Sequence, residues 1–471
     1  MFENVLGQGA SLQLIEDIKA GYLARSMLFY GPPASGKGSA ALELSRVISC
    51  GENAAWACQC PACSRHRYLL HPDLLCLGPR SFSAEITASA KAFLRETLNQ
   101  EKDSVSAGTK TGAARILFIR SARKLLARFN PLLWEDEPKA GKIFPLVNSL
   151  EDSLDELISA AAETAIASKA GASENQNALS KLVDSIIKDS YKLESEGIAE
   201  IIPIGQLRRA AAWSHLAPSG KGKFLIIENA DRMQDEARNS LLKILEEPPE
   251  SLHCVLTTSR QGNLLPTIVS RLRPYRFYQR DAAVEKDVIR RVFRTEAAEA
   301  EFTSINGYLD SFLPVPGNVL EGLAAFFAAS VAYKEVLLCK KQGKSLPQAA
   351  VLLGKYSAPK AEAAGLGRPL GDAGELVPKI IEKAGSFEIR SLFSRFLANV
   401  LEQVSGSLKC VEINSSAARI DSSSILPSPD YNERWKKCIN WAGLAALTYK
   451  LRPAQVLEKL FTDLSREMTD L

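Results

Sequence analysis

The sequence lacks a strong excess of charge of either sign and lacks an apolar stretch long enough to cross a bilayer. Its 58 Lys and Arg against 54 Asp and Glu leave a net charge of +4, which excludes a histone-like basic protein and an acidic solvating tail. The nearest apolar candidate, residues 322–333, falls short of the roughly 18 residues that span a membrane. We therefore expect a buried helix there and no membrane partner. Acidic residues near the start, with no long apolar region, argue against a signal peptide.

Cysteines are sparse outside one short stretch, since four of the nine fall within residues 50–63. This distribution excludes a secreted disulfide framework and is typical of a cytosolic chain with one metal cluster. Four thiolates are enough for a closed, structural, tetrahedral Zn²⁺ site, and four buried free thiols this close together would be unusual. His66 and His71 are alternatives to one thiolate, although a His in this context more often caps a loop. The candidate ligands are Cys50, Cys58, Cys60 and Cys63, and the spacing of the middle two predicts a strained turn.

A Gly- and Pro-rich loop follows the apolar run at residues 26–30 and precedes apolar residues at helical spacing. This order predicts the strand, loop and helix of an α/β nucleotide-binding fold. The loop matches the first seven positions of G-x-x-x-x-G-K-[ST], whose backbone N–H groups and lysine bind phosphate. A simple turn would leave the lysine unexplained. The candidate phosphate-binding residues are Gly31, Pro32, Pro33, Ala34, Ser35, Gly36, Lys37, Gly38 and Ser39.

Groups that phosphate chemistry needs are missing from two places. Gly38 stands where a Ser or Thr hydroxyl would bind Mg²⁺, and Ser39 lies about 100° further round the helix. The apolar run at residues 223–227 ends in Glu228-Asn229 instead of two acids, and Asn229 cannot accept a proton as a general base. We therefore expect weak or no ATP binding and no efficient ATP hydrolysis.

Two strings resemble the bacterial clamp-loader subunits of DNA polymerase III, which are AAA+ proteins. Residues 229–233 (NADRM) and 239–249 (NSLLKILEEPP) are similar to the helix that follows the Walker B strand in these subunits, and they are the most specific match. The resemblance covers residues 1–80 and about 200–330. It implies a component of the DNA-directed DNA polymerase holoenzyme.

The same resemblance assigns further residues. The string VLGQ at residues 5–8 resembles the box beside the adenine, and Thr258 falls at the sensor 1 position. Residues 264–271 resemble the arginine-finger segment, with Arg271 as the finger. Residues 316–319 offer no sensor 2 arginine. A chain that keeps the finger for its neighbour but loses its own catalytic groups resembles the delta-prime subunit, a stator without ATPase activity of its own.

The resemblance implies an α/β P-loop AAA+ domain, a small helical lid and an all-α C-terminal collar. A long helical insertion interrupts the AAA+ domain, and its residues 107–114 and 167–177 have the composition of flexible links. The expected boundaries are 1–84 and 201–278 for the AAA+ domain with a zinc module at 50–63, 85–200 for the insertion, 279–325 for the lid and 326–471 for the collar.

Basic residues in the insertion leave several interpretations open. Residues 115–129 carry five Lys and Arg among apolar residues, which fits binding to DNA phosphates or to an anionic membrane. We favour packing on the acidic residues 151–200 of the same insertion. Arg208 and Arg209 are candidates for contact with DNA or with a neighbouring subunit.

The sequence thus predicts a delta-prime-like, cytoplasmic clamp-loader subunit that supplies Arg271 to a neighbouring ATPase. The expected partners are gamma/tau and delta subunits in a hetero-pentamer, the sliding clamp and primer-template DNA, with structural Zn²⁺ as cofactor. One alternative is a gamma/tau-like motor in which Ser39 and Glu228 still hold Mg²⁺. Another is a zinc-containing DNA-binding adaptor outside replication, which the string at residues 239–249 disfavours.

Overall fold

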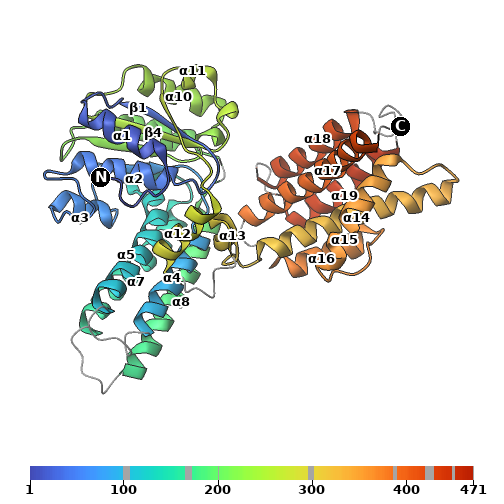
Figure 1. Ribbon diagram of the computed structural model, residues 1–471, viewed down its shortest axis with the longest axis horizontal. Helices are drawn as coiled ribbons and strands as arrows, with labels where there is room; N and C mark the ends of the chain where they lie inside the picture. Colours follow the sequence, from blue (N-terminus) through green and yellow to red (C-terminus); the bar gives the residue numbers. More distant parts are fainter. Residues whose placement is uncertain are drawn as a thin grey trace. The chain divides into compact units, whose positions relative to one another are not determined.

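A five-stranded parallel sheet forms the centre of the N-terminal unit in this computed structural model (Figure 1). The strand order is β2-β3-β4-β1-β5, and every neighbouring pair is parallel. Parallel neighbours require long crossovers, which helices supply here. The strands are β1 (Ser26–Tyr30), β2 (Leu74–Leu77), β3 (Lys223–Ile227), β4 (Leu252–Thr258) and β5 (Arg273–Arg276).

Alternate strand residues face two separate cores. Met27 and Ile226 point into a core shared with α1, α2 and the cysteine stretch, whereas Leu28 and Leu225 point into a core shared with α9, α10 and α11. The sheet is buried on both faces, which explains the continuous apolar runs of β1 and β3. These helices are α1 (Gly9–Lys19), α2 (Lys37–Ser49), α3 (Pro61–Arg67), α9 (Ile204–Ser214), α10 (Asp235–Glu246) and α11 (Pro266–Val269).

Helices between β2 and β3 form a bundle that extends away from the sheet (Figure 1). Within it α4 packs on α5 and α8, and α7 packs on α8. Residues 107–114 begin α5, so the expected flexible link there is wrong; of 167–177, residues 172–177 begin α8 and the rest lie outside the described residues. The helices are α4 (Ser83–Leu98), α5 (Ala107–Leu126), η2 (Ala127–Phe129), α6 (Pro131–Trp134), α7 (Ala140–Thr164) and α8 (Ala172–Gly197).

The chain divides into two compact units, Met1–Phe312 and Leu313–Leu471. The sheet, the bundle and two further helices, α12 (Ala282–Phe293) and α13 (Ile305–Asp310), belong to the first unit. The lid and collar boundaries drawn from the sequence stay predictions. The structure describes residues 1–98, 107–164, 172–199, 201–294, 302–385, 390–418, 429–447 and 451–469.

Among its described residues, the second unit consists of helices joined by loops. Its first helix is long and apolar enough to cross a membrane by length and composition, with a mean hydropathy of 1.5 over an 18-residue window, but 72% of that window is buried inside the protein. The helix is longer than the apolar run at residues 322–333 that the sequence shows. It is mostly buried, as expected for a core helix. The helices are α14 (Gly317–Gln342), α15 (Gln348–Ala363), α16 (Ala373–Lys383), α17 (Arg390–Ala418), α18 (Pro429–Leu447) and α19 (Pro453–Thr469).

Candidate functional site: a phosphate loop, a cysteine cluster and an exposed arginine

The Gly- and Pro-rich loop connects β1 to the first turn of α2, in the strand–loop–helix order expected from the sequence. Gly31 has φ +147 and approaches the Phe277 carbonyl so closely that a Cβ would collide with it. Gly36 has φ +94 and precedes α2 directly. Both glycines allow a backbone path that other residues rarely adopt.

Lys37 is turned back onto its own loop. Its Nζ donates hydrogen bonds to the carbonyls of Gly31 at 2.8 Å and Pro32 at 2.6 Å, and it lies 3.2 Å from Ser35 Oγ. Burial lowers the pKa of Lys37 to about 8, although Glu228 and Asp231 act in the opposite direction. To reach a phosphate, the ammonium would have to leave these three oxygens.

Arg280 covers the outside of the loop, a contact that sequence reasoning missed. Its Nη1 donates to Ala34 O and its Nε to Leu6 O, both at 2.8 Å. Its Nη2 lies only 2.7 Å from where a Cβ on Gly36 would stand. Gln8, in the same N-terminal box, pairs its amide with the backbone of Tyr278 at 2.9 and 3.0 Å. The loop is thus bound to the segment after β5.

Glu228 fills the space beside position 38. A Cβ added to Gly38 would collide with Glu228 Oε1. The other oxygen, Oε2, pairs with Arg128, and Arg80 Nη1 lies 3.4 Å from Oε1. Burial raises the pKa of Glu228, but Arg128, Arg80 and Lys124 outweigh it, so the net pKa is lowered. Two arginines therefore hold the acid at the position where the family resemblance places a magnesium-binding acid.

The polar side chains that follow β3 and β4 form hydrogen bonds within the chain. Asn229 has φ +51, and its Nδ2 donates to Pro79 O at 2.6 Å. The Thr258 hydroxyl donates to Asp231 Oδ1 at 2.6 Å and accepts from the Arg260 N–H at 2.9 Å. Ser39 lies half-buried in the first turn of α2. Neither Asn229 nor Thr258 offers a base for activating water.

Arg271 stands on the other face of the sheet from α2. It lies two residues after the end of α11, whose Ile268 belongs to the core opposite that of α2. Its side chain is 35% exposed, with Nη2 2.7 Å from Glu246 Oε1 and Nη1 donating to Thr267 O at 2.7 Å. Ser270 beside it is also exposed. The Arg271 guanidinium is therefore accessible from outside the chain and is paired with one exposed carboxylate, that of Glu246.

Four cysteines come together as the sequence predicted, with ligand atoms all within 4.8 Å of one another. Sulfur-to-sulfur distances from Cys50 are 3.7 Å to Cys58 and 3.9 Å to Cys60. Cys60 caps α3 with φ −57 and ψ 153, and residues 58–60 have no positive φ, so the expected strained turn is absent from this described stretch. The set of four thiols fits a tetrahedral metal site such as Zn²⁺.

Polar groups around the cluster favour a thiolate at Cys60. Arg46 Nη1 donates to Cys63 Sγ at 3.0 Å, and Arg46 is itself paired with buried Glu43. Burial works against the Cys60 thiolate, but hydrogen bonds, first from the backbone N–H groups, bring the pKa of Cys60 down to about 6. A backbone hydrogen bond lowers the pKa of Cys58, but a hydrogen bond to Glu52 and burial outweigh it and raise that pKa to about 11, and burial raises the pKa of Cys63. Such positive and N–H-rich surroundings favour a metal-bound sulfur.

The two histidines are committed elsewhere. His66 bonds Ser49 Oγ at 2.9 Å and Ser45 Oγ at 3.3 Å, and it stacks on His71. His71 Nδ1 accepts the Asp73 N–H at 3.2 Å, so it caps a loop. Neither replaces a thiolate in this arrangement.

The basic residues of α5 bind the core of the unit more than the acidic segment. Arg120 donates to the last carbonyls of α3, and Lys124 pairs with Glu85. Among the described ion pairs of α5, only that of Arg123 reaches the acidic residues 151–200, with Nη2 3.5 Å from Asp155 Oδ1. The favoured interpretation from sequence is confirmed in part: α5 contacts α7 and α8 and shares a core with them. The helix also stabilises the junction of bundle, cysteine stretch and sheet.

Comparison with known proteins places the chain. The parallel sheet and the strand–loop–helix order fit an α/β AAA+ fold. A family model for "DNA polymerase III, delta subunit" matches residues 8–159 and 146–281, more than half of the chain. The chain belongs to this family of clamp-loader subunits, and the curated relatives that match it are delta' subunits.

Individual relatives match over shorter stretches. The DNA polymerase III subunit delta' of Bacillus subtilis is 43% identical over 72 residues, which are 14% of this chain and 22% of that protein. The subunit delta' of Pseudomonas aeruginosa is 32% identical over 122 residues, or 25% and 37%. The chain thus matches less than two thirds of either relative. A gamma subunit-related structure from Thermotoga maritima is 18% identical with a TM-score of 0.25, covering 57% of this chain and 81% of that one.

Proposed function

We propose that this chain is a delta-prime-type stator that lends Arg271 to the ATP site of a neighbouring motor subunit during sliding-clamp loading. The observation that carries the proposal is the contrast between two sites. The chain's own magnesium position is filled by Glu228 held between Arg80 and Arg128, whereas Arg271 is exposed on the opposite face. An arginine supplied in trans stabilises the charge of phosphoryl transfer by about 10³–10⁵ in turnover.

The bundle supports a static role for the first unit. Ala88 of α4 shares a core with Ile289 and Phe293 of α12. Arg95 donates to Arg294 O at 3.1 Å, and Tyr191 of α8 donates to Phe312 O at 3.1 Å. These contacts brace α12 and α13 against the bundle and restrict their movement relative to it.

The motor alternative requires Glu228 and Ser39 to bind Mg²⁺. The first requirement conflicts with the ion pairs of Glu228, because both carboxylate oxygens already face guanidinium groups. A divalent ion would have to displace two guanidinium groups from Glu228, and breaking a buried ion pair from one side is strongly destabilising. The two ion pairs of Glu228 therefore favour the stator over the motor subunit.

The remaining parts of the proposal follow from the family. We propose Zn²⁺ as a structural ion on Cys50, Cys58, Cys60 and Cys63, and a lid and collar in the C-terminal helices. Gamma/tau and delta subunits, the clamp and primer-template DNA are the proposed partners, in the cytoplasm. Nucleotide in the chain's own site would be bound weakly or not at all.

The test uses the complex assembled with the ATPase subunits of the same genome. Arg271→Ala should lower DNA-stimulated ATPase of the complex by at least about 10²-fold while assembly, measured by size exclusion, is unchanged. Arg276→Ala, at an exposed arginine of β5, is the matched control and should keep full turnover. Full turnover in the Arg271→Ala complex would refute the role.

A further inference from the structure

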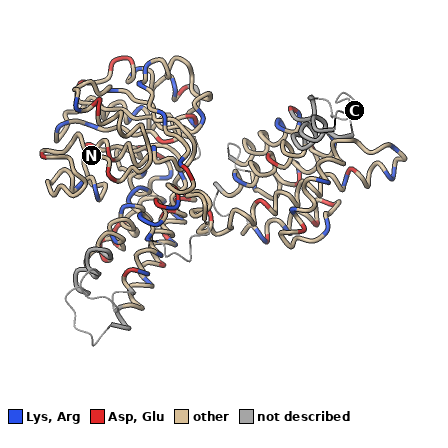
Figure 2. Tube along the Cα trace, in the orientation of Figure 1, with Lys and Arg blue, Asp and Glu red and all other residues tan. Residues whose placement is uncertain are grey.

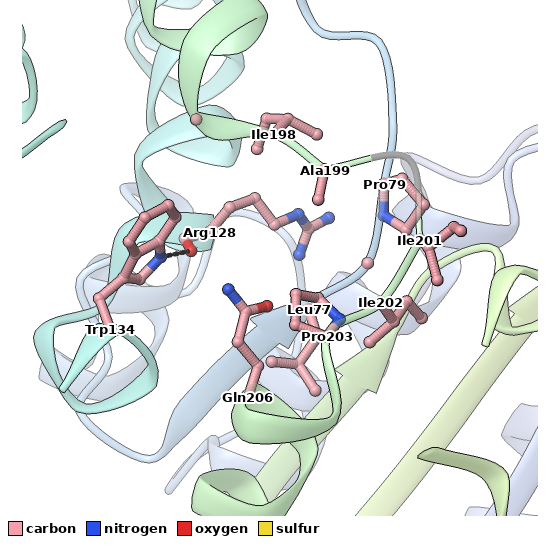
Figure 3. A pocket seen from close by; sticks show the side chains of 12 residues that line it. Leu77, Pro79, Arg128, Trp134, Ile198, Ala199, Ile201, Ile202, Pro203 and Gln206 are labelled. Atoms are coloured by element: carbon pink, nitrogen blue, oxygen red, sulfur yellow. Dashed lines mark hydrogen bonds between the residues drawn. The ribbon is translucent and has the colours of Figure 1, made fainter. Parts of the chain in front are cut away.

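A small pocket lies at the end of β2, where α6, α9 and the end of α8 approach the sheet. Its walls are mostly apolar, with Leu77, Trp134, Ile198 and Ile202 among them. Within the described part of the chain, Arg128 is the only charged residue that lines it. Figure 3 shows the Arg128 guanidinium reaching in among the labelled side chains, with the Gln206 amide on another wall.

Arg128 has hydrogen-bonding capacity that the described residues do not use. Its side chain is 7% exposed. Nη2 pairs with Glu228, and Trp134 Nε1 binds only the backbone carbonyl of Arg128. Nε and Nη1 are buried and have no partner within the described part of the chain. The Phe82 ring lies 5.4 Å from the guanidinium carbon, and the Cys76 thiol is also near.

Buried N–H donors of a charged group are rarely left without acceptors, because the lost hydration is not recovered. Among the described residues that line it, the pocket holds no carboxylate, and Glu228 reaches only one nitrogen. What the site lacks is therefore a hydrogen-bond acceptor with negative charge.

A helix end adds to the attraction for an anion. The eleven-residue α9 begins at Ile204 after Pro203, without a side-chain cap, and Pro203 lines the pocket. The first N–H groups of a helix and its dipole favour anions. The last turn of α8 also lines the pocket, and the negative partial charge of a helix C-terminus repels an anion. That partial charge is only about half of the full positive charge on a guanidinium.

We propose that this pocket binds a small oxyanion of the phosphate or carboxylate type, with Arg128 as the main ligand and Gln206 as a second donor. The planar guanidinium has two edges that each present two N–H groups, and Nη2 contributes a hydrogen to both. One N–H of Nη2 can stay on Glu228 while an edge of the guanidinium donates to two oxygens of the ligand. This site is separate from the phosphate loop and from Lys37.

The geometry predicts competition between the ligand and Glu228 for the charge of Arg128. Replacing Glu228 by Gln removes that competitor and leaves Arg128 in place. Affinity for the anion should therefore rise about tenfold in Glu228→Gln and fall at least about tenfold in Arg128→Gln.

The experiment titrates the full-length chain with sodium phosphate, and in a second arm with sodium acetate, at ionic strength fixed with sodium chloride. Binding is followed by calorimetry and by the rise in unfolding temperature that a ligand of the folded state produces. Saturable binding of either anion is expected, and the arm that saturates at lower concentration identifies the ligand type. Arg208→Gln, at an exposed arginine of α9, is the matched control and should bind like the unaltered chain.

Two further variants keep the test decisive. If Arg128→Gln does not fold, Arg128→Gln/Glu228→Gln removes both charges together and must also lose binding. Lys37→Ala should retain binding; loss of binding in Lys37→Ala would assign the anion to the phosphate loop and overturn the proposal, as would absence of saturation by both anions. The stator role is tested separately, because neither Arg271 nor a partner subunit takes part here.

Discussion

Removing Arg128 tests the interpretation that a buried ion pair replaces magnesium beside the phosphate loop. Glu228 is 8% exposed and Arg128 7%, so Arg128→Ala leaves a buried carboxylate with only Arg80, whose side chain is 28% exposed. Breaking a buried pair from one side costs about 3–5 kcal/mol. Because Arg80 remains, we expect the lower end, about 3 kcal/mol. For a unit of 312 residues this lowers the unfolding temperature by about 5 °C.

The assay is thermal and urea unfolding of the full chain, arranged as a double-mutant cycle. Glu228→Gln should also destabilise, and Arg128→Ala/Glu228→Gln should be less destabilised than the sum of the two single variants by about 2 kcal/mol, which is the coupling between the two groups. Arg208→Gln, at an exposed arginine, should change stability by less than about 0.5 kcal/mol. Since the pKa of Glu228 is lowered in the folded protein, the stabilisation should be present above its unfolded pKa and lost as pH falls through the folded value. Additive effects in the cycle would refute the reasoning.

Two other predictions concern the cysteine cluster and Lys37. About one equivalent of zinc should copurify with the chain by mass spectrometry of metals and be absent from Cys58→Ser/Cys60→Ser, since four thiolates are needed for a closed site; folded, metal-free unaltered chain would contradict this. The lowered pKa of Lys37, about 8, means that the unfolded chain binds more protons between pH 8 and about 10.5, so stability should rise over that range. Urea unfolding should show that this rise is smaller in Lys37→Met, and an equal rise would count against the buried ammonium.

Local signals predicted the sheet and the two motifs near it. The apolar runs of β1 and β3 are buried on both faces, and the glycines of the loop adopt the positive φ that a phosphate loop needs. The four cysteines converge because they lie close in sequence around α3. The strands, the loop and the cysteine cluster are each determined by residues that lie close to one another in the sequence.

Contacts between distant residues could not be predicted in the same way. Arg128 and Glu228 are 100 positions apart, and Arg280 meets the loop from 246 positions away. The composition of residues 107–114 favours a link, yet tertiary packing makes them helical. The loss of the hydroxyl at Gly38 was visible in the sequence, but its counterpart, a carboxylate occupying the vacated space, required the folded arrangement.

Turnover of Mg²⁺-ATP by the purified chain tests the central claim most directly. With Glu228 held by Arg80 and Arg128 and no base at Asn229, we predict a hydrolysis rate no higher than that of Lys37→Ala. A rate comparable to that of a clamp-loader motor subunit, abolished by Lys37→Ala, would contradict the account.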